Sequence, residues 1–288
     1  MVVVEANAKI NLTLDILGTR PDGYHEVEMV MQSVALFDTI RLERIEKSIE
    51  LSSGSEELPA DETNLVWKAA HLFMETVGVG AGVRIAVGKR IPIAAGLAGG
   101  STDAAGTLIG MNRLFDAGLS ADALCAMGER IGSDVPFCIM GGTMLATGRG
   151  EKLRRLAAMP DVWVVLAKPP ISVSTAWAYR QFDAFSEVRH PDTRAAIRAL
   201  DEGSPEGVAA SLGNVLEGVT AKAHGEIPAY KEILLQNGAM GALMSGSGPT
   251  VFALARTVPE ARRAAEALSR ARPEAAVFTV PVVGANIL

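Results

Sequence analysis

This chain of 288 residues has few cysteines, few aromatic residues and no excess of positive charge. The two cysteines, Cys125 and Cys138, fit no zinc-binding spacing and make no disulfide framework, so we expect both to behave as small buried apolar residues. The formal net charge of −6 argues against a general nucleic-acid or anionic-membrane binder. A phosphate ligand would therefore have to be met locally, by backbone amides and a few cations.

Long apolar segments are missing as well. No stretch reaches the ~18 residues needed to cross a bilayer, and Met1 to Glu5 lack the basic start of a secretory signal. Hydrophobic residues still make up 49% of the chain, which is enough for a substantial core. These features predict a cytoplasmic globular protein of one large or two smaller domains, with no membrane or nucleic-acid partner.

Residues 2–16 alternate almost perfectly between apolar and polar, which predicts a long strand with one face in the core. Lys9 lies on the polar face between Asn7 and Asn11. A solvated face is the plainer interpretation of a single lysine. Asparagines are poor strand formers, however, and a merely exposed face does not need them. If this face lines a cleft, Lys9 supplies it with a fixed positive charge.

The remaining pattern mixes strands with helices, which favours an α+β fold over a doubly wound α/β fold. A turn over 20–23 precedes strands over 27–37 and 39–46, and 133–142 fits a turn followed by a short apolar strand. The organisation changes near 156–161. The other expected elements are helices over 64–77, 120–131, 174–182, 192–200, 205–212, 228–236 and 259–271, and strands over 82–87, 162–167, 242–244, 251–255 and 275–283.

The most informative segment is a glycine-rich loop, 92–102, that leads directly into helix-forming sequence. Glycines let the backbone approach a ligand closely, and the first N–H groups of a helix bind phosphate. Ser101 and Thr102 are good N-cap residues, and Asp103 suits the positive end of the helix dipole. The loop lacks the lysine of a Walker A motif and the spacing of a dinucleotide fingerprint. Close helix packing is the alternative explanation for such glycines.

Two further segments are candidates for the same site. Asp134, just before Val135 and Pro136, is either a turn residue or the carboxylate that phosphoryl transfer needs beside an attacking hydroxyl. A nearby Lys9 would keep it ionised and offset charge on the transferred group. The glycine-rich segment 245–249 is typical of a hairpin, which is either a tight turn or one wall of a cleft.

These motifs, taken in order, resemble the GHMP kinases, named for galactose, homoserine, mevalonate and phosphomevalonate kinases. The likeness extends from Ala8 to about Phe252 and is weakest over 173–236. Its most specific parts, the Lys9 segment and the Pro-Asp-Gly-Tyr-His segment, resemble the branch that acts on a cytidine diphosphate ester of methylerythritol. The matching segments are 8–12, 18–25, the glycine-rich loop, 132–137, 148–151 and 245–249.

The resemblance implies two α+β lobes with ligands in the cleft between them. Residues 1–158 would form a ribosomal-S5-like N-terminal lobe that binds ATP, and 159–288 a ferredoxin-like C-terminal lobe. It also implies transfer of the γ-phosphoryl group of ATP, with Mg²⁺, to the 2-hydroxyl of the methylerythritol ester, a step of non-mevalonate isoprenoid synthesis.

Roles for individual residues follow from the same resemblance. Asp134 would be the general base and Lys9 its partner, while Ser101 and Thr102 would lie near the metal-bound oxygens. Tyr24 and His25 would take the cytosine, although a core aromatic and a structural histidine are the plainer interpretations of these two. The ATP site would comprise Pro92, Ile93, Ala94, Ala95, Gly96, Leu97, Ala98, Gly99, Gly100, Ser101 and Thr102, with Asn64 and Leu65 at the adenine; Asn11, Gly246 and Ser247 would join the substrate site.

Some assignments stay open on the sequence. The metal ligands are not located, and the second aromatic that stacks on cytosine is one of Trp177, Tyr179, Phe182 and Phe185. The oligomeric state is either a monomer or a homodimer. Another small-alcohol GHMP kinase would share the phosphate loop without needing Tyr24 and His25. A non-catalytic nucleotide-binding regulator would bind ATP without needing Asp134.

Overall fold

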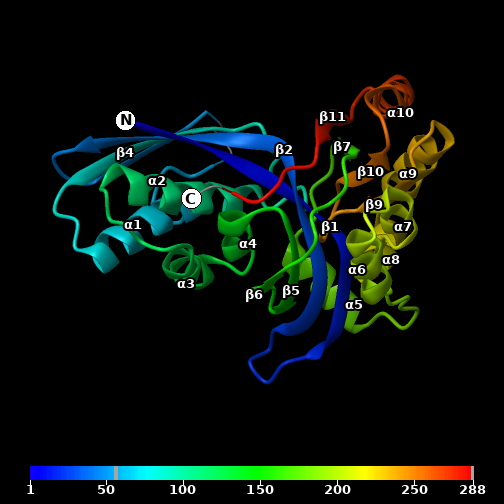
Figure 1. Ribbon diagram of the computed structural model, residues 1–288, viewed down its shortest axis with the longest axis horizontal. Coiled ribbons are helices and arrows are strands. Elements are labelled where there is room, and N and C mark those ends of the chain that lie inside the picture. The colour runs from blue at the N-terminus through cyan, green and yellow to red at the C-terminus, as the bar shows by residue number, and fades with distance from the viewer. Residues whose placement is uncertain (55–57, 287–288) are drawn as a thin grey trace.

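Two sheets organise the computed structural model, which describes residues 1–54 and 58–286 (Figure 1). The first has seven strands in the order β3-β4-β2-β1-β8, with β5 beside β2 and β6 beside β5. The second has four strands in the order β11-β7-β10-β9. Their bounds are β1 Val2–Thr19, β2 His25–Ile45, β3 Ile49–Ser53, β4 Gly82–Gly88, β5 Thr143–Gly148, β6 Lys152–Arg155, β7 Trp163–Lys168, β8 Gly213–Asn214, β9 Gly241–Met244, β10 Val251–Ala255 and β11 Ala276–Pro281.

Helices accompany both sheets, so the expected α+β class is confirmed. Among the described residues, helices α1 to α4 lie on the side of Figure 1 that holds β4, whereas α7, α9 and α10 pack against the second sheet. No helix in the described part of the chain is long and apolar enough to span a membrane. The helices are α1 Leu65–Val77, α2 Gly99–Leu114, α3 Ala121–Ile131, α4 Val135–Met140, α5 Thr175–Asp183, α6 Thr193–Asp201, α7 Pro205–Ala210, α8 Val215–Ala223, α9 Glu226–Gln236 and α10 Val258–Ala271.

The strands β1 and β2 form one long antiparallel ribbon. The sequence predicts two strands over 27–37 and 39–46, but the structure has a single strand, because β2 stays paired with β1 along its length through register shifts. On its outer edge β2 pairs first with β5 and then with β4. The ribbon therefore links the two ends of the first sheet, and its hairpin projects from the molecule (Figure 1).

Both faces of β1 are buried where they matter for the site. Ile10 and Leu12, on the apolar face, are fully buried in a cluster that includes Leu166 of the second sheet. Lys9 and Asn11, on the opposite face, are also buried. Burial of charged and amide groups is costly unless they are paired. Burial therefore excludes the solvated interpretation of this face, and Lys9 and Asn11 line a cavity.

Helix α4 corrects the expectation of a short apolar strand within 133–142. Six consecutive apolar residues have no period that distinguishes a strand from a buried helix. Pro136, near the first helical position, presets a helical φ and lacks the N–H that would be unpaired there. Asp134 consequently sits at the N-terminus of a helix rather than in a turn before a strand.

Helix α2 begins earlier than its capping residues suggest. Ser101 and Thr102 lie inside the first turn, because the helix starts at Gly99 after Ala98, whose φ of 59° is left-handed. No side chain caps the helix. The Thr102 hydroxyl instead donates to the Asn7 carbonyl at 3.1 Å. The backbone turn at Ala98 thus replaces the expected cap, and the first amides of α2 have no side-chain acceptor in the described structure.

Candidate active site

A single cavity of about 1010 Å³ brings together most of the residues expected from the sequence. It lies where β1, the glycine-rich loop, helix α5 and the 245–249 hairpin converge. Leu97 and Thr102 are the expected site residues that do not line it, since both are buried behind the loop. The expected residues that do are Lys9, Asn11, Tyr24, His25, Asn64, Leu65, Pro92, Ile93, Ala94, Ala95, Gly96, Ala98, Gly99, Gly100, Ser101, Asp134, Gly246 and Ser247.

The two glycine-rich segments meet in the fold. The Ser245 hydroxyl donates to the Gly96 carbonyl at 3.0 Å, and the Thr250 N–H donates to the Ala95 carbonyl at 3.3 Å. A Cβ placed at Gly96 would lie 2.1 Å from the Ser245 carbonyl oxygen, so only glycine fits there. The hairpin between β9 and β10 is thus a wall of the cavity as well as a tight turn.

The backbone of the glycine-rich loop has the geometry of an anion site. Positive φ angles occur at Ala94, Gly96 and Ala98, with negative values between them. Alternation of this kind turns successive N–H groups toward one side, as in the nests that bind phosphate. A left-handed alanine costs on the order of 1 kcal/mol, and such strain is typical of ligand-binding loops. Helix α2 then adds the positive end of its dipole.

Lys9 and Asp134 face one another across the cavity. The Lys9 ammonium lies 3.8 Å from the Asp134 carboxylate, and it donates to the Asn11 side-chain oxygen at 2.7 Å and the Gly96 carbonyl at 3.2 Å. The Lys9 side chain is 6% exposed and that of Asp134 is 32% exposed. The lysine is therefore held rigidly by three oxygen partners, while the carboxylate keeps room for a ligand.

A buried ionic cluster joins the two ends of the glycine-rich loop. Lys89, before the loop, bonds to Asp103, after it, at 2.7 Å, and also to Asp38 on β2. Asp38 accepts the N–H groups of Arg90 and Ile91 at 2.6 and 2.9 Å. Burial raises the pKa of Asp103 to about 7, with the charge of Lys89 opposing that rise. The cluster fixes the span of the loop through a cation shared by two carboxylates.

Aromatic and imidazole groups also line the cavity. The His25 ring lies 4.9 Å from the Tyr179 ring, and its Nε2 is 2.7 Å from Asp183. Tyr24 is 55% exposed and lies under the Arg149 guanidinium, 5.1 Å from its ring centre. Burial raises the pKa of the Tyr179 hydroxyl, and the Asp134 charge adds to that rise. The exposed Tyr24 is plainly not the core aromatic that the sequence alone favours.

The four competing aromatics are separated by the structure. Trp177 faces His224, with ring centres 6.1 Å apart, and Phe185 lies under Lys222. Phe182 packs on the main core. Tyr179 is the one that lines the cavity, because it projects from α5 toward His25.

The start of helix α1 forms the wall beside the glycine-rich loop. Asn64 caps the helix, accepting the Val66 N–H at 2.9 Å and donating to the Pro59 carbonyl at 2.7 Å. Leu65 approaches Gly100, where an added Cβ would lie 3.4 Å from its Cδ1. Asn64 therefore shapes this wall, and Leu65 supplies its apolar surface.

The sequence analysis does not identify some residues that also line the cavity, namely Lys89, Arg149 and Asp183. Arg149 belongs to a motif of the resemblance, but nothing in that motif assigns it a contact. Asp183 ends an exposed helical turn, and Lys89 is an ordinary strand-end lysine. Of the two cysteines, Cys138 is buried as expected, whereas Cys125 is only half-buried. Burial raises the pKa of Cys138 to about 12 and that of Cys125 to about 11, which leaves both thiols protonated.

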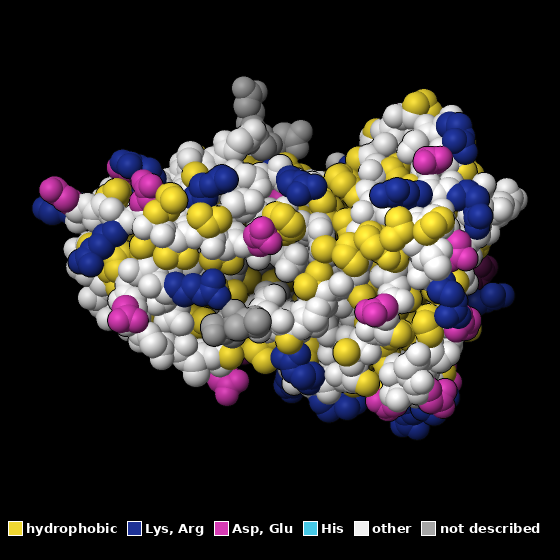
Figure 2. Space-filling view, turned by 45° about the horizontal axis from the view of Figure 1, so that its top comes forward, with side chains coloured by type: hydrophobic (Ala, Val, Ile, Leu, Met, Phe, Trp, Pro, Cys, Tyr) yellow, Lys and Arg dark blue, Asp and Glu magenta, His cyan; other side chains and the backbone are white. Residues whose placement is uncertain are grey.

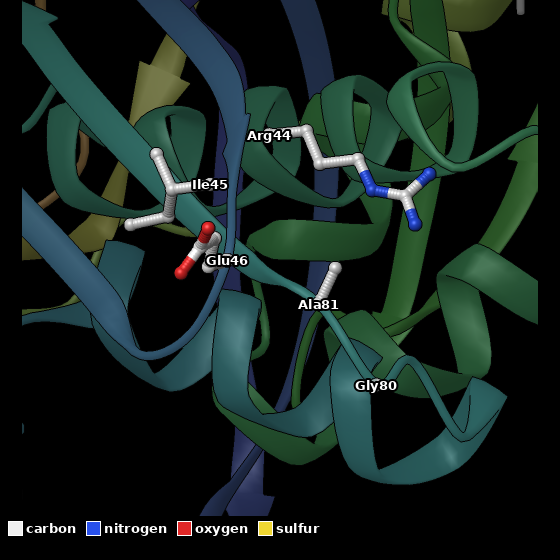
Figure 3. Close-up of a pocket in the computed structure, with 5 residues that line it drawn as sticks. All are labelled: Arg44, Ile45, Glu46, Gly80 and Ala81. Carbon is white, nitrogen blue, oxygen red and sulfur yellow. The ribbon is translucent and has the colours of Figure 1, made fainter.

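A second hollow of about 580 Å³ lies at the far end of the first sheet (Figure 3). It is lined by Arg44, Ile45, Glu46, Gly80 and Ala81, and the Arg44 and Glu46 side chains extend in opposite directions. Its polar groups do not converge on one point.

On the face shown in Figure 2, acidic and basic side chains are interspersed, without the large basic area of a nucleic-acid footprint.

A metal ion finds few protein ligands here. Within residues 1–54 and 58–286, no three His, Cys, Asp or Glu side chains gather closely enough to hold one. A divalent ion brought by a nucleotide can keep its phosphate and water ligands and take only one or two from the protein. The described residues therefore offer no cluster of three such side chains for a metal ion.

Known proteins with similar sequences decide the family. The models of the GHMP kinases N terminal domain and of the GHMP kinases C terminal domain match residues 64–142 and 196–274. A 4-diphosphocytidyl-2-C-methyl-D-erythritol kinase from Bacillus velezensis is 51% identical over 263 residues, and one from Bacillus subtilis is 48% identical over 263 residues. Each alignment covers 91% of both chains. The chain belongs to this family of GHMP kinases.

Solved structures agree with that membership. A crystal structure of a 4-(cytidine 5'-diphospho)-2C-methyl-D-erythritol kinase has a TM-score of 0.83 and 34% identity, covering 98% of this chain and 100% of the other. The homoserine kinase of Cytophaga hutchinsonii, with a TM-score of 0.79 and 19% identity, covers 99% and 95% and shows the shared fold. The GHMP kinase fold expected from the motifs is confirmed, and the protein is an ATP-dependent kinase.

Proposed function

We propose that this kinase transfers the γ-phosphoryl group of ATP to the 2-hydroxyl of 4-diphosphocytidyl-2-C-methyl-D-erythritol in non-mevalonate isoprenoid synthesis. The observation that carries the proposal is the composition of one cavity. A glycine-rich loop, the Lys9–Asp134 pair, and His25 with Tyr24 and Tyr179 all line it. One cavity thus combines a phosphate site, an aromatic site of the size of a base and the pair that would do the chemistry.

Asp134 is the general base of the proposed reaction. Its carboxylate accepts the proton of the attacking hydroxyl, and the Lys9 ammonium lies 3.8 Å away. The lysine also lies within reach of charge that develops on the transferred group. Asn11 and the Gly96 carbonyl fix the position of Lys9 and so the direction of its charge.

The loop from Pro92 to Thr102 holds the ATP phosphates, and Leu65 borders the adenine. Mg²⁺ carried by ATP would neutralise phosphate charge there. Two hydroxyls of the loop are candidates to lie near the metal. Ser101 lines the cavity, whereas the hydroxyl of Thr102 is buried and bonded to the Asn7 carbonyl. Ser101 is therefore the better candidate for a protein oxygen beside the metal. Gly246 and Ser247, which line the cavity, together with Asn11 contact the substrate.

His25, Tyr24 and Tyr179 recognise the cytosine. Aromatic stacking contributes ~1–3 kcal/mol per base, so two tyrosines can set substrate choice. Asp183 holds the imidazole of His25 in one orientation through their 2.7 Å contact. We place the reaction in the cytoplasm, with a small-molecule substrate and no nucleic-acid partner, in lobes divided near 158.

Replacing His25 tests the cytosine site. We expect His25→Ala to raise KM for the cytidyl substrate about 10-fold, the equivalent of one lost hydrogen bond of ~1.4 kcal/mol, with KM for ATP little changed. Steady-state kinetics with each substrate varied in turn measures both constants. His71→Ala, on the exposed side of α1, is the matched control and should change neither. A rise in KM for ATP instead would move His25 out of the substrate site.

A further inference from the structure

The chain beyond β11 returns to the first sheet. Val282 bridges to Val34 of β2, and the Val283 N–H donates to the Ser33 carbonyl at 2.9 Å. The Gln32 side-chain amide donates to the Val283 carbonyl, also at 2.9 Å. In Figure 1 this red segment leaves β11 and crosses to the side that holds α2 and α4. We call residues 282–286 the C-terminal strap.

The strap ends on the C-terminus of α4. The Asn286 side-chain amide donates to the carbonyls of Cys138 and Ile139, both at 2.9 Å, and its N–H donates to the Met140 carbonyl at 3.0 Å. The last carbonyls of any helix have no partner within the helix. Here Asn286 alone satisfies three of them, in a helix of only six residues.

Gly141 and Gly142 are shaped to receive the strap. Their φ angles are +62° and +81°. A Cβ at Gly141 would lie 3.0 Å from the Asn286 side chain, and one at Gly142 would lie 3.0 Å from the Ala285 nitrogen. Gly141 and Ala285 also form an antiparallel bridge. Gly141 also caps α4, its N–H donating to the Phe137 carbonyl at 2.7 Å, so the end of the helix and the seat of Asn286 are built from the same residues.

Helix α4 carries Asp134 at its N-terminus. That end has no side-chain cap, and the helix is too short to be stable by its own backbone bonds. Its position therefore depends on packing and on the anchored C-terminus. We propose that Asn286 is a positioning residue, which through α4 holds the Asp134 carboxylate at its working distance from Lys9. This inference rests on the proposed role of Asp134 as the general base.

The test is a double-mutant cycle between Asn286 and Asp134. Displacement of a catalytic group by a fraction of an ångström lowers turnover, and 1 Å can cost 10²-fold. We expect Asn286→Ala to lower kcat about 10-fold, with KM for ATP within about twofold of wild type. In an Asp134→Asn background the same change should cost nothing further, because no base is left to misplace.

A matched control removes general effects of losing a helix cap. Asn237 donates its side-chain amide to the Ile233 carbonyl at 2.8 Å, at the C-terminus of α9 in the second half of the chain. Asn237→Ala should leave kcat unchanged. Hydrogen exchange read by mass spectrometry adds a measurement that needs no turnover: in Asn286→Ala, exchange should rise in α4 and not in α9.

The outcomes distinguish the positioning role of Asn286 from the general-base role of Asp134. Normal kcat in Asn286→Ala, unchanged exchange in α4, or an equal loss of kcat in both backgrounds overturns the positioning role. If Asp134→Asn alone keeps wild-type turnover, the base assignment fails and the positioning role fails with it. If Asp134→Asn is inactive while Asn286→Ala is normal, only the positioning role fails.

Discussion

Asp134→Asn should lower kcat by about 10²-fold or more, which is the scale of losing a general base. The variant should fold, because the Asp134 side chain is 32% exposed and makes no cap bond in α4. Lys9 keeps its bonds to Asn11 and Gly96 when Asp134 becomes neutral. Steady-state turnover, with thermal unfolding to check the fold, measures the effect.

ATP binding separates this prediction from a general loss of the site. Because the proposed phosphate site consists of loop amides and does not include Asp134, the affinity for ATP should stay within about twofold of wild type. Asp183→Asn is the control, since it removes a carboxylate from the same cavity that contacts His25 and not Lys9. It should alter KM for the cytidyl substrate and leave kcat largely intact. Near-normal kcat in Asp134→Asn would refute the assigned base.

Gly96→Ala should be nearly as damaging, for a steric reason. The new methyl group would lie 2.1 Å from the Ser245 carbonyl oxygen, a backbone atom that cannot swing aside. The glycine-rich loop and the 245–249 hairpin would have to separate, which also shifts the Gly96 carbonyl that holds Lys9. We expect kcat/KM for ATP to fall by about 10²-fold, the cost of about 1 Å of misplacement.

Gly118→Ala isolates that collision from ordinary backbone strain. Gly118 has a φ of +62°, close to the +75° of Gly96, but a Cβ there would meet nothing within 4 Å. Both variants therefore carry the same left-handed penalty of on the order of 1 kcal/mol. Equal kinetic losses in the two would show that the loop and the hairpin do not need to touch.

How far the sequence predicts the structure depends on the range of the interaction involved. The alternation around Lys9 predicts both the strand and its polar face, because it depends on local geometry alone. The sequence also predicts the glycine-rich loop over 92–102 and the helix that follows it, since the glycines and the helix start are neighbours in the chain. Helix α4 was mispredicted because six apolar residues carry no usable period.

Contacts between distant segments lie beyond what a single sequence can show. The residues of the 245–249 segment do not predict the hydrogen bond between Ser245 and Gly96, which are 149 residues apart. The choice of Tyr179 among four aromatics depends on how α5 faces the β1–β2 hairpin. The contact of His25 with Asp183 spans 158 residues and appears only in the fold.

The most direct test of the proposed function is ADP release from Mg·ATP by the purified protein. The assay compares 4-diphosphocytidyl-2-C-methyl-D-erythritol with mevalonate, homoserine and galactose at equal concentrations. The proposed function predicts turnover with the cytidyl substrate alone. Turnover with one of the other alcohols, or with none of the four, would contradict it.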